Sequence, residues 1–244
     1  MARTAGDVLE VPRERIFMKR RDRQRGAAQY ERVDERQARF VVHEGGLKFL
    51  VNLSDYVDTG LFLDHRITRQ MVREAAADKR FLNLFAYTGS FTVYAAAGGA
   101  ETTTTVDKSA TYIDWARENL ALNAFTGPQH ELVRSDIREF VNSLSPRDQW
   151  DVAVVDPPTF SNTKGIDDDW DVQRDHAELL RRLAAHITPG GTAFFSTNFR
   201  RFKLDETTLA DAYTIRNITR QTIPEDFRNQ RTHKCWKLIR RGPA

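Results

Sequence analysis

Short apolar runs alternate with amphipathic segments over residues 81–196 of the chain. Runs rich in β-branched and aromatic residues indicate strands, whereas apolar residues that recur every three or four positions indicate helices. In segment 109–123, for example, Tyr112, Ala116 and Leu120 share one helical face behind Ser109, a favourable N-cap residue. The predicted strands are 81–85, 102–106, 131–134, 151–155 and 192–196, and the predicted helices are 89–97, 109–123, 137–144 and 171–187.

This alternation of strands and helices with short connections predicts an α/β fold. We expect a mostly parallel sheet with helices on both faces, because parallel strands need crossover connections that cover the sheet. A turn at 189–191 precedes the strand 192–196, and less regular strand candidates follow at 214–219 and 235–240. Ligands of such sheets bind beyond the carboxyl ends of the strands. The chemistry is therefore expected just after residues 85, 106, 134, 155 and 196.

The first 60 residues have a different pattern. Two β-rich runs flank Glu44-Gly45-Gly46, and glycine supplies the positive φ that a tight hairpin turn requires. Residues 1–12 are interpreted as a loose leader, and a helix is predicted over 65–77. We therefore expect a basic N-terminal segment and β-hairpin appendage over residues 1–60, and the main domain over residues 61–244.

The composition is typical of a globular chain that needs no cross-links. Of its 244 residues, 40% are hydrophobic and 29% are charged, which suits one large domain with a small appendage. Cys235 is the only cysteine, which excludes an internal disulfide framework and a cysteine-based zinc cluster. The six histidines lack ligand spacings such as H-E-x-x-H, so we predict no metal. No apolar run approaches the ~20 residues of a membrane span or resembles a signal peptide, so we expect a cytoplasmic protein without membrane contact.

Positive charge is concentrated in two segments, although the net charge is only +3. Residues 12–25 contain seven Lys or Arg against two acids, and a second basic run covers 228–241. Segregated positive charge is typical of proteins that bind polyphosphates, and Lys19, Arg20 and Arg21 are candidate contacts to a nucleic acid. The alternative for each run alone is a solvated helix face or a frayed terminus.

Candidate ligand-binding residues follow the first three predicted strands. The segment 83–91 leads into a helix whose first N–H groups are free to bind an anion. Gly89 is its only glycine, which disfavours a dinucleotide such as NAD. Asp107 can accept both hydroxyls of a ribose or can cap the next helix with Ser109, and Asp136 can meet an adenine or act as a helix cap.

The sharpest pattern is Asp156-Pro157-Pro158 at the end of the fourth strand. The two prolines stiffen the turn and hold Asp156 at the sheet edge. Such a loop would present carbonyl groups and the ring of Phe160 to a planar group, for example a base removed from its stack. The alternative is a rigid loop with Phe160 in the core.

Together, these segments resemble the class I S-adenosylmethionine-dependent methyltransferases. More narrowly, they resemble the RlmK family, the guanine-N7 methyltransferase half of the bifunctional bacterial enzymes that modify 23S rRNA. The similarity extends from about residue 15 to residue 240 and includes the runs 51–66, 103–108, 171–176 and 233–236. It implies a Rossmann-like fold with a seven-stranded sheet, S-adenosyl-L-methionine as cofactor, S-adenosyl-L-homocysteine as product, and 23S rRNA or a large-subunit assembly intermediate as partner.

The resemblance also implies roles for individual residues. Asp156, Pro157 and Phe160 would face the target base, and Asp156 would also lie against the cofactor. The residues implied to bind the cofactor are Asp64 and Arg66 near its amino acid end, Asn83, Phe85, Tyr87, Thr88 and Gly89 along its methionine and ribose, Asp107 and Lys108 after the second strand, and Asp136 and Ile137 around the adenine.

Guanine N7 carries a lone pair and no proton, so methylation there needs positioning rather than a general base. Because N7 and O6 are acceptors, donors should hold the base, and Lys164, Asn198 and Arg200 are candidates by location. The bifunctional enzymes carry a second methyltransferase half and an RNA-binding THUMP domain upstream. Neither is present in this sequence, which predicts a free-standing version or an isolated half, with a monomer as the simplest state.

Other activities remain open from the sequence. Cytosine-C5 methylation of RNA needs a nucleophilic cysteine, and none follows the strands that end at 155 and 196, while Cys235 fits a small core residue better. Exocyclic-amine methylation uses loops similar to Asp-Pro-Pro-x-Phe. A non-catalytic RNA-binding module with a vestigial cofactor fold, and a small-molecule methyltransferase, are the alternatives from other classes.

Overall fold

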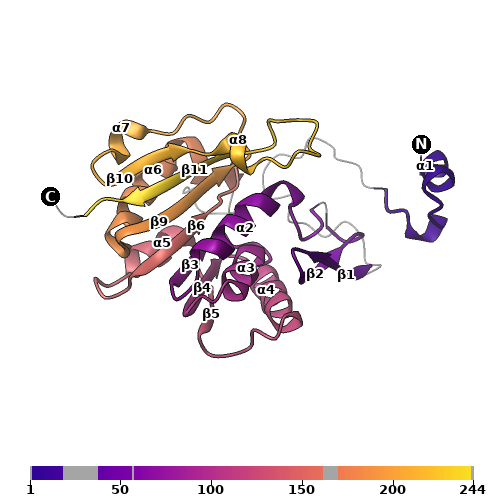
Figure 1. The fold of residues 1–244 in the computed structure, drawn as a ribbon, viewed down its shortest axis with the longest axis horizontal. Helices are drawn as coiled ribbons and strands as arrows, with labels where there is room; N and C mark the ends of the chain where they lie inside the picture. The colour runs from indigo at the N-terminus through magenta and orange to yellow at the C-terminus, as the bar shows by residue number, and fades with distance from the viewer. Residues whose placement is uncertain (1, 19–37, 57, 162–169, 243–244) are drawn as a thin grey trace.

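The computed structural model describes residues 2–18, 38–56, 58–161 and 170–242 (Figure 1). Lys19, Arg20, Arg21 and Lys164 lie outside the described residues. The N-terminal helix α1 (Ala2–Leu9) is drawn apart from the main body, in which a twisted sheet lies between two layers of helices.

A seven-stranded sheet forms the centre of the molecule, with the order β10-β11-β9-β6-β3-β4-β5. β11 is antiparallel to both of its neighbours, and the remaining pairs are parallel. The predicted Rossmann-like, mostly parallel sheet is therefore confirmed. The strands are β3 (Arg80–Leu84), β4 (Thr102–Asp107), β5 (His130–Arg134), β6 (Trp150–Val155), β9 (Ile187–Thr197), β10 (Tyr213–Asn217) and β11 (Lys234–Arg240).

Helices cover both faces because successive strand residues point to opposite sides. In β6, Val152 and Val154 pack with the layer that contains α2 and α3, whereas Ala153 and Val155 pack with the layer that contains α5 and α6. The first layer consists of α2 (Arg66–Ala75), α3 (Ser90–Ala97), α4 (Ala110–Leu122) and α8 (Thr219–Thr222), and the second of α5 (Ile137–Ser143), α6 (Val172–Leu183) and α7 (Glu206–Leu209). None of the described helices has both the length and the apolar character needed to cross a bilayer.

The predicted hairpin is present as β1 (Arg39–Glu44) and β2 (Leu47–Asn52). Its two-residue turn, Gly45-Gly46, has φ values of 59° and 80°, which side chains other than glycine rarely adopt. Phe49 of β2 is fully buried and stacks on Tyr94 of α3 at 5.9 Å between ring centroids. The hairpin is thus fastened to the helical layer through its own apolar face.

Two local expectations were wrong. Residues 2–9 form a short helix instead of a loose leader. The predicted turn at 189–191 lies within β9, where Trp150 pairs with Ile187 and Val152 pairs with Thr192, so the extra residues form an irregularity and the strand continues. The other short elements are the 3-10 turns Arg13–Arg15, Leu63–His65 and Ala184–His186 and the ribbon of β7 (Phe160–Ser161) with β8 (Trp170–Asp171).

Candidate active site

The candidate residues gather at the carboxyl ends of the parallel strands. β3 occupies the centre, with β4 and β5 on one side and β6 and β9 on the other. The strand order therefore reverses at β3, which is where ligands bind in open α/β sheets. Two groups of loops meet at this edge, one after β3, β4 and β5 and one after β6 and β9.

The loop after β3 has an unusual backbone. Phe85, Tyr87 and Gly89 have φ values of 56°, 50° and 72°. An aromatic residue held in the left-handed region costs about 1–3 kcal/mol, and such residues cluster at functional sites. A Cβ atom at Gly89 would also lie 2.7 Å from the Cβ atom of Ala116, so only glycine fits there. The residue pattern by itself had drawn attention to Gly89, whereas Phe85 and Tyr87 were named through the family resemblance.

Buried polar groups hold this loop in place. Asn83 donates from Nδ2 to Thr92 Oγ1 at 3.0 Å, and Thr88 donates from Oγ1 to the Gly60 carbonyl at 2.6 Å. Asn119 of α4 donates to the carbonyl of Thr88 at 2.9 Å. The side chains of Asn83 and Thr88 are each 1% exposed, so both shape the loop from beneath.

Asp107 ends β4 and touches the same loop. Its Oδ2 atom accepts the Tyr87 N–H and its Oδ1 atom accepts the Ser109 N–H, both at 2.9 Å. Burial raises the pKa of Asp107 to about 6, against the lowering effect of these backbone bonds. Ser109 is the N-cap of α4, so Asp107 is left as a carboxylate between two loops, with lone pairs for a further donor.

Asp136 is the N-cap of α5 and accepts the Arg138 N–H at 2.9 Å. The Nζ atom of Lys108 lies 3.5 Å from its Oδ2 atom, which joins the loops after β4 and β5. Ile137 follows and is 4% exposed. Asp136 therefore caps a helix, which was the alternative to adenine binding, and it does so at the edge of the sheet where the adenine was expected.

Asp156 links the loops after β6 and β9. Ser196 of β9 donates to its Oδ1 atom at 2.6 Å, and His65 Nε2 lies 3.6 Å from its Oδ2 atom. Thr159 donates to Asn198 Oδ1 at 2.7 Å. Phe160 is 50% exposed, so the alternative that its ring fills the core is wrong.

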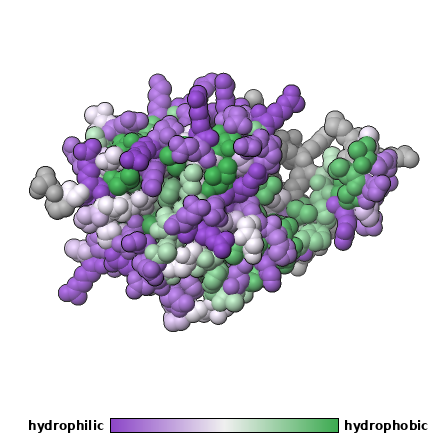
Figure 2. Space-filling model, viewed as in Figure 1, coloured by the Kyte–Doolittle hydropathy of each residue, from purple (hydrophilic) through white to green (hydrophobic). Residues whose placement is uncertain are grey.

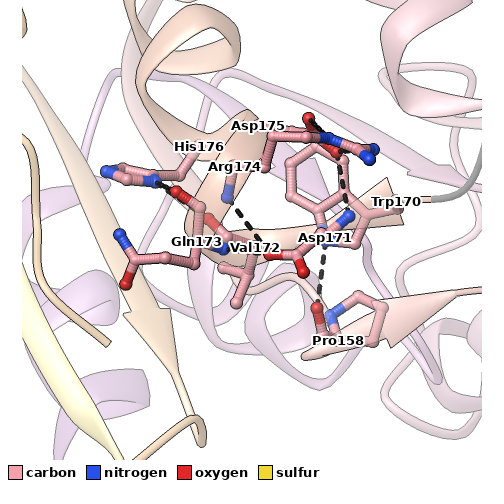
Figure 3. Close-up of polar contacts among 8 residues, drawn as sticks. All are labelled: Pro158, Trp170, Asp171, Val172, Gln173, Arg174, Asp175 and His176. Carbon is pink, nitrogen blue, oxygen red and sulfur yellow. Dashed lines mark hydrogen bonds and ion pairs between the residues drawn. The ribbon is translucent and has the colours of Figure 1, made fainter. Parts of the chain in front are cut away.

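The loop that contains Pro157 and Pro158 is anchored to α6 (Figure 3). Trp170 donates from its indole to the Pro158 carbonyl at 3.0 Å, and Asp171 caps α6 by accepting the Gln173 N–H at 2.7 Å. His176 is buried, with Nδ1 at 2.8 Å from the Val172 carbonyl and Nε2 accepting the Asp205 N–H at 3.0 Å. Both of its ring nitrogens are used within the fold, where His176 joins α6 to the residue that precedes α7.

Sequence analysis missed a buried cluster beside Asp156. His233 Nδ1 lies 3.0 Å from Asp64 Oδ2, and its ring stacks on that of His65 at 4.4 Å with an angle of 16°. Burial lowers the pKa of His65. Burial opposes ionisation of Asp64, but the hydrogen bond from His233 and the neighbouring imidazoles keep its pKa below the ordinary value.

These three residues place one ligand atom each within 4.8 Å of one another. Parallel stacked imidazoles direct their in-plane lone pairs side by side, which is unfavourable for two ligands of one ion. The prediction of no metal stays a prediction. Arg66, next in the chain, forms an ion pair with Asp226 at the surface, with Nη1 3.0 Å from Oδ2. The runs 51–66 and 233–236 contained these residues, but nothing in the sequence indicated that they meet.

Cys235 is the second residue of β11 and is fully buried, which confirms it as a core residue. Burial, together with the nearby negative charge of Asp156, raises the pKa of its thiol. A raised pKa keeps the sulfur protonated, and the thiolate is the nucleophilic form. Cys235 therefore lacks the properties of a catalytic nucleophile.

The polar groups at this edge of the sheet fit S-adenosylmethionine. A carboxylate at the end of β4 suits a ribose diol, and the left-handed backbone after β3 brings main-chain groups to the same edge. Comparison with known proteins agrees, because the family model of S-adenosylmethionine-dependent methyltransferases matches residues 8–237.

Individual relatives are also similar. The chain is 51% identical over 235 residues to the ribosomal RNA large subunit methyltransferase K/L of Methylococcus capsulatus, covering 96% of this chain and 32% of that protein. It is 48% identical over 226 residues to the ribosomal RNA large subunit methyltransferase K of Neisseria meningitidis serogroup B, covering 92% of this chain and 64% of that protein. The chain thus spans about a third of the length of the K/L relatives.

A solved structure shares the fold. The crystal structure of SMU.776, a putative methyltransferase complexed with SAH, superimposes with a TM-score of 0.72 at 26% identity, over 84% of this chain and 57% of that chain. The match to the family model extends over nearly the whole chain. The chain therefore belongs to the S-adenosylmethionine-dependent methyltransferases.

Proposed function

We propose that this chain transfers a methyl group from S-adenosylmethionine to N7 of a guanine in 23S rRNA. The observation that carries the proposal is the position of Phe160, an exposed aromatic ring that follows Asp156-Pro157-Pro158 at the edge where the cofactor loops meet. The rRNA substrate is supported by the names of relatives K and K/L, of which this chain matches a part.

The cofactor residues divide between two sides of β3. Asp107 would accept the ribose hydroxyls, and the loop from Phe85 to Gly89 would carry the methionine part. Asp136, with Lys108 and Ile137, would frame the adenine, whereas Asp64 and Arg66 would lie near the amino acid end. When bound, S-adenosylmethionine supplies a methyl group on a positively charged sulfur and leaves as S-adenosylhomocysteine.

The residues after β6 and β9 would hold the base. The ring of Phe160 offers a stacking surface, and Asp156, fixed by Ser196, orients the loop. Asn198 accepts from Thr159 through Oδ1, which leaves its amide nitrogen to donate to an acceptor such as O6 or N7. Arg200 lies two residues further on and is exposed, so its guanidinium group can donate to the RNA beside the base. Guanine N7 loses no proton, so no residue has to act as a general base.

Replacing Asp156 by alanine is expected to reduce methyl transfer about 100-fold, because a misplaced base loses near-attack geometry. The assay is transfer from labelled S-adenosylmethionine to unmodified 23S rRNA, followed by mass spectrometry of the nucleosides. Asp211→Ala, at an exposed carboxylate before β10, is the control and should retain the wild-type rate. Label in 5-methylcytidine or in an exocyclic-amine product would refute the N7 assignment.

Cytosine-C5 methylation makes a separate prediction at Cys235. If the reaction is N7 methylation, Cys235→Ala should keep the methyl-transfer rate within about threefold, because the buried thiol has no chemical role. A cysteine-dependent enzyme would lose nearly all activity. The measurement is the initial rate at saturating cofactor, with thermal unfolding as a check that the variant is folded.

A further inference from the structure

A polar cleft opens beside the loop that follows β9. Its volume is about 820 Å³, within the range typical of ligand sites. Arg200 and Arg201, just after β9, line it together with Arg220 of α8 and Arg231, just before β11. Among the described residues that line the cleft, none is acidic. Hydrophilic side chains predominate over this side of the molecule, where α8 and β11 lie (Figure 2).

The four arginines differ from most others in the chain. Arg66 pairs with Asp226, and Arg182 pairs with Glu178, as is usual for a cation near acidic neighbours. Over the described ranges, by contrast, the guanidinium groups that line the cleft have neither an ion pair nor a hydrogen bond, and all four side chains are exposed. Cations gathered around one cleft without counter-charges favour an anionic ligand with several charges.

The cleft is next to the candidate base site and away from the cofactor strands. Lys234, at the start of β11, pairs with Thr197 at the end of β9, so the cleft lies at the carboxyl edge of the sheet. Asn198 lines it and is bonded to Thr159 of the Asp156 loop. Asp107 and Asp136 follow β4 and β5, on the opposite side of β3.

We propose that this cleft binds the phosphodiester backbone of single-stranded RNA next to the target nucleotide. The inference rests on the proposed function in that the target is an RNA base. Guanidinium groups match phosphate oxygens with paired donors, and four of them from three segments around one cleft suit successive phosphates better than one small anion. The carboxamides of Gln221 and Gln230 line the same cleft and can pair with 2′-hydroxyls. A strand with a splayed base, as methylation requires, exposes these groups.

The test measures RNA binding separately from catalysis. Arg220→Ala/Arg231→Ala and Arg200→Ala/Arg201→Ala each remove two of the four guanidinium groups, and Arg147→Ala is the matched control. Arg147 is exposed, has no partner among the described residues, and lies before β6 at the opposite edge of the sheet. Affinity of the chain for an unmodified 23S rRNA transcript is measured by filter binding from 50 to 300 mM salt, and affinity for S-adenosylhomocysteine by calorimetry.

Each double variant is expected to bind RNA roughly 10-fold more weakly, with a salt slope smaller by about 1.4, since about 0.7 is lost per phosphate contact to a single strand. Arg220→Lys/Arg231→Lys keeps both positive charges and should therefore retain most of the wild-type salt slope of RNA binding. Affinity for S-adenosylhomocysteine and the binding of Arg147→Ala should equal the wild-type values.

Unchanged RNA affinity in both double variants would overturn the proposal, as would an equal loss in Arg147→Ala. Failure of the wild-type chain to bind RNA even at the lowest salt would also overturn it. Failure of the proposed function has a different signature. Label in a nucleoside other than 7-methylguanosine removes the guanine-N7 assignment, whereas the cleft proposal stands if the double variants bind RNA more weakly than the wild type.

Discussion

Replacing Asp107 by alanine is expected to weaken binding of S-adenosylhomocysteine by about 100-fold or more. A hydrogen bond to a charged acceptor contributes about 1.5–3 kcal/mol, so the loss of two ribose contacts removes about 3 kcal/mol, and each 1.4 kcal/mol is tenfold in affinity. Calorimetry measures the affinity, and circular dichroism checks the fold. Asp114→Ala, at an exposed carboxylate in the first part of α4, is the control and should bind normally.

The same prediction has a pH signature. The pKa of Asp107 is raised to about 6, so the carboxylate is mostly ionised at pH 7 and mostly protonated at pH 5. The ionised form accepts both hydroxyls, whereas the protonated form cannot, and affinity should fall about tenfold from pH 7 to pH 5. This dependence should be absent in Asp107→Ala. A wild-type affinity that does not change over this range would contradict the ribose role.

Replacing Glu44 by alanine is expected to lower the free energy of unfolding by about 3–5 kcal/mol, the usual cost of leaving a buried charge without its partner. Glu44 accepts from Arg69 Nε at 2.8 Å and Nη2 at 2.9 Å, and from the Tyr94 hydroxyl at 3.0 Å. Arg69 is 1% exposed, and burial with the charge of Glu44 raises the pKa of Tyr94 to about 12. Urea unfolding followed by circular dichroism measures the change.

Two comparisons make this prediction specific. Glu118→Ala breaks the exposed pair with Arg39, which also joins the hairpin to a helix, and should cost less than about 1 kcal/mol. The double variant Glu44→Ala/Arg69→Met removes both buried charges and should regain much of the loss. Equal effects of Glu44→Ala and Glu118→Ala would show that burial of the pair has no energetic importance.

The local sequence pattern was sufficient to predict the strands of the sheet and part of the candidate site. Strand runs, helical spacing and the pair Gly45-Gly46 predicted elements that the structure contains, because each depends on residues close in sequence. The left-handed Phe85 and Tyr87 carry no such signal, since aromatic residues do not favour that backbone. Contacts of this loop with β4 and α4 impose the left-handed backbone.

Long-range pairs were also beyond the sequence pattern. Asp64 and His233 meet although 169 positions separate them, and Arg69 meets Glu44 from another element. Arg220 lies in a four-residue helix within an irregular region, so nothing near it indicates that it lines the same cleft as Arg200 and Arg201. The residues at strand ends were found because the sheet brings them together by a general rule.

The place of β11 in the sheet has a consequence for the order in which the chain folds. β11 is the last strand in sequence but lies between β9 and β10, and its entry brings His233 to Asp64. Neighbouring strands β3, β4, β5 and β6 can pair earlier, because shorter loops close at a lower entropic cost. A nascent chain on the ribosome can therefore form the edge that carries Asp107 and Asp136 first, whereas the contact between His233 and Asp64 forms only after β11 has emerged.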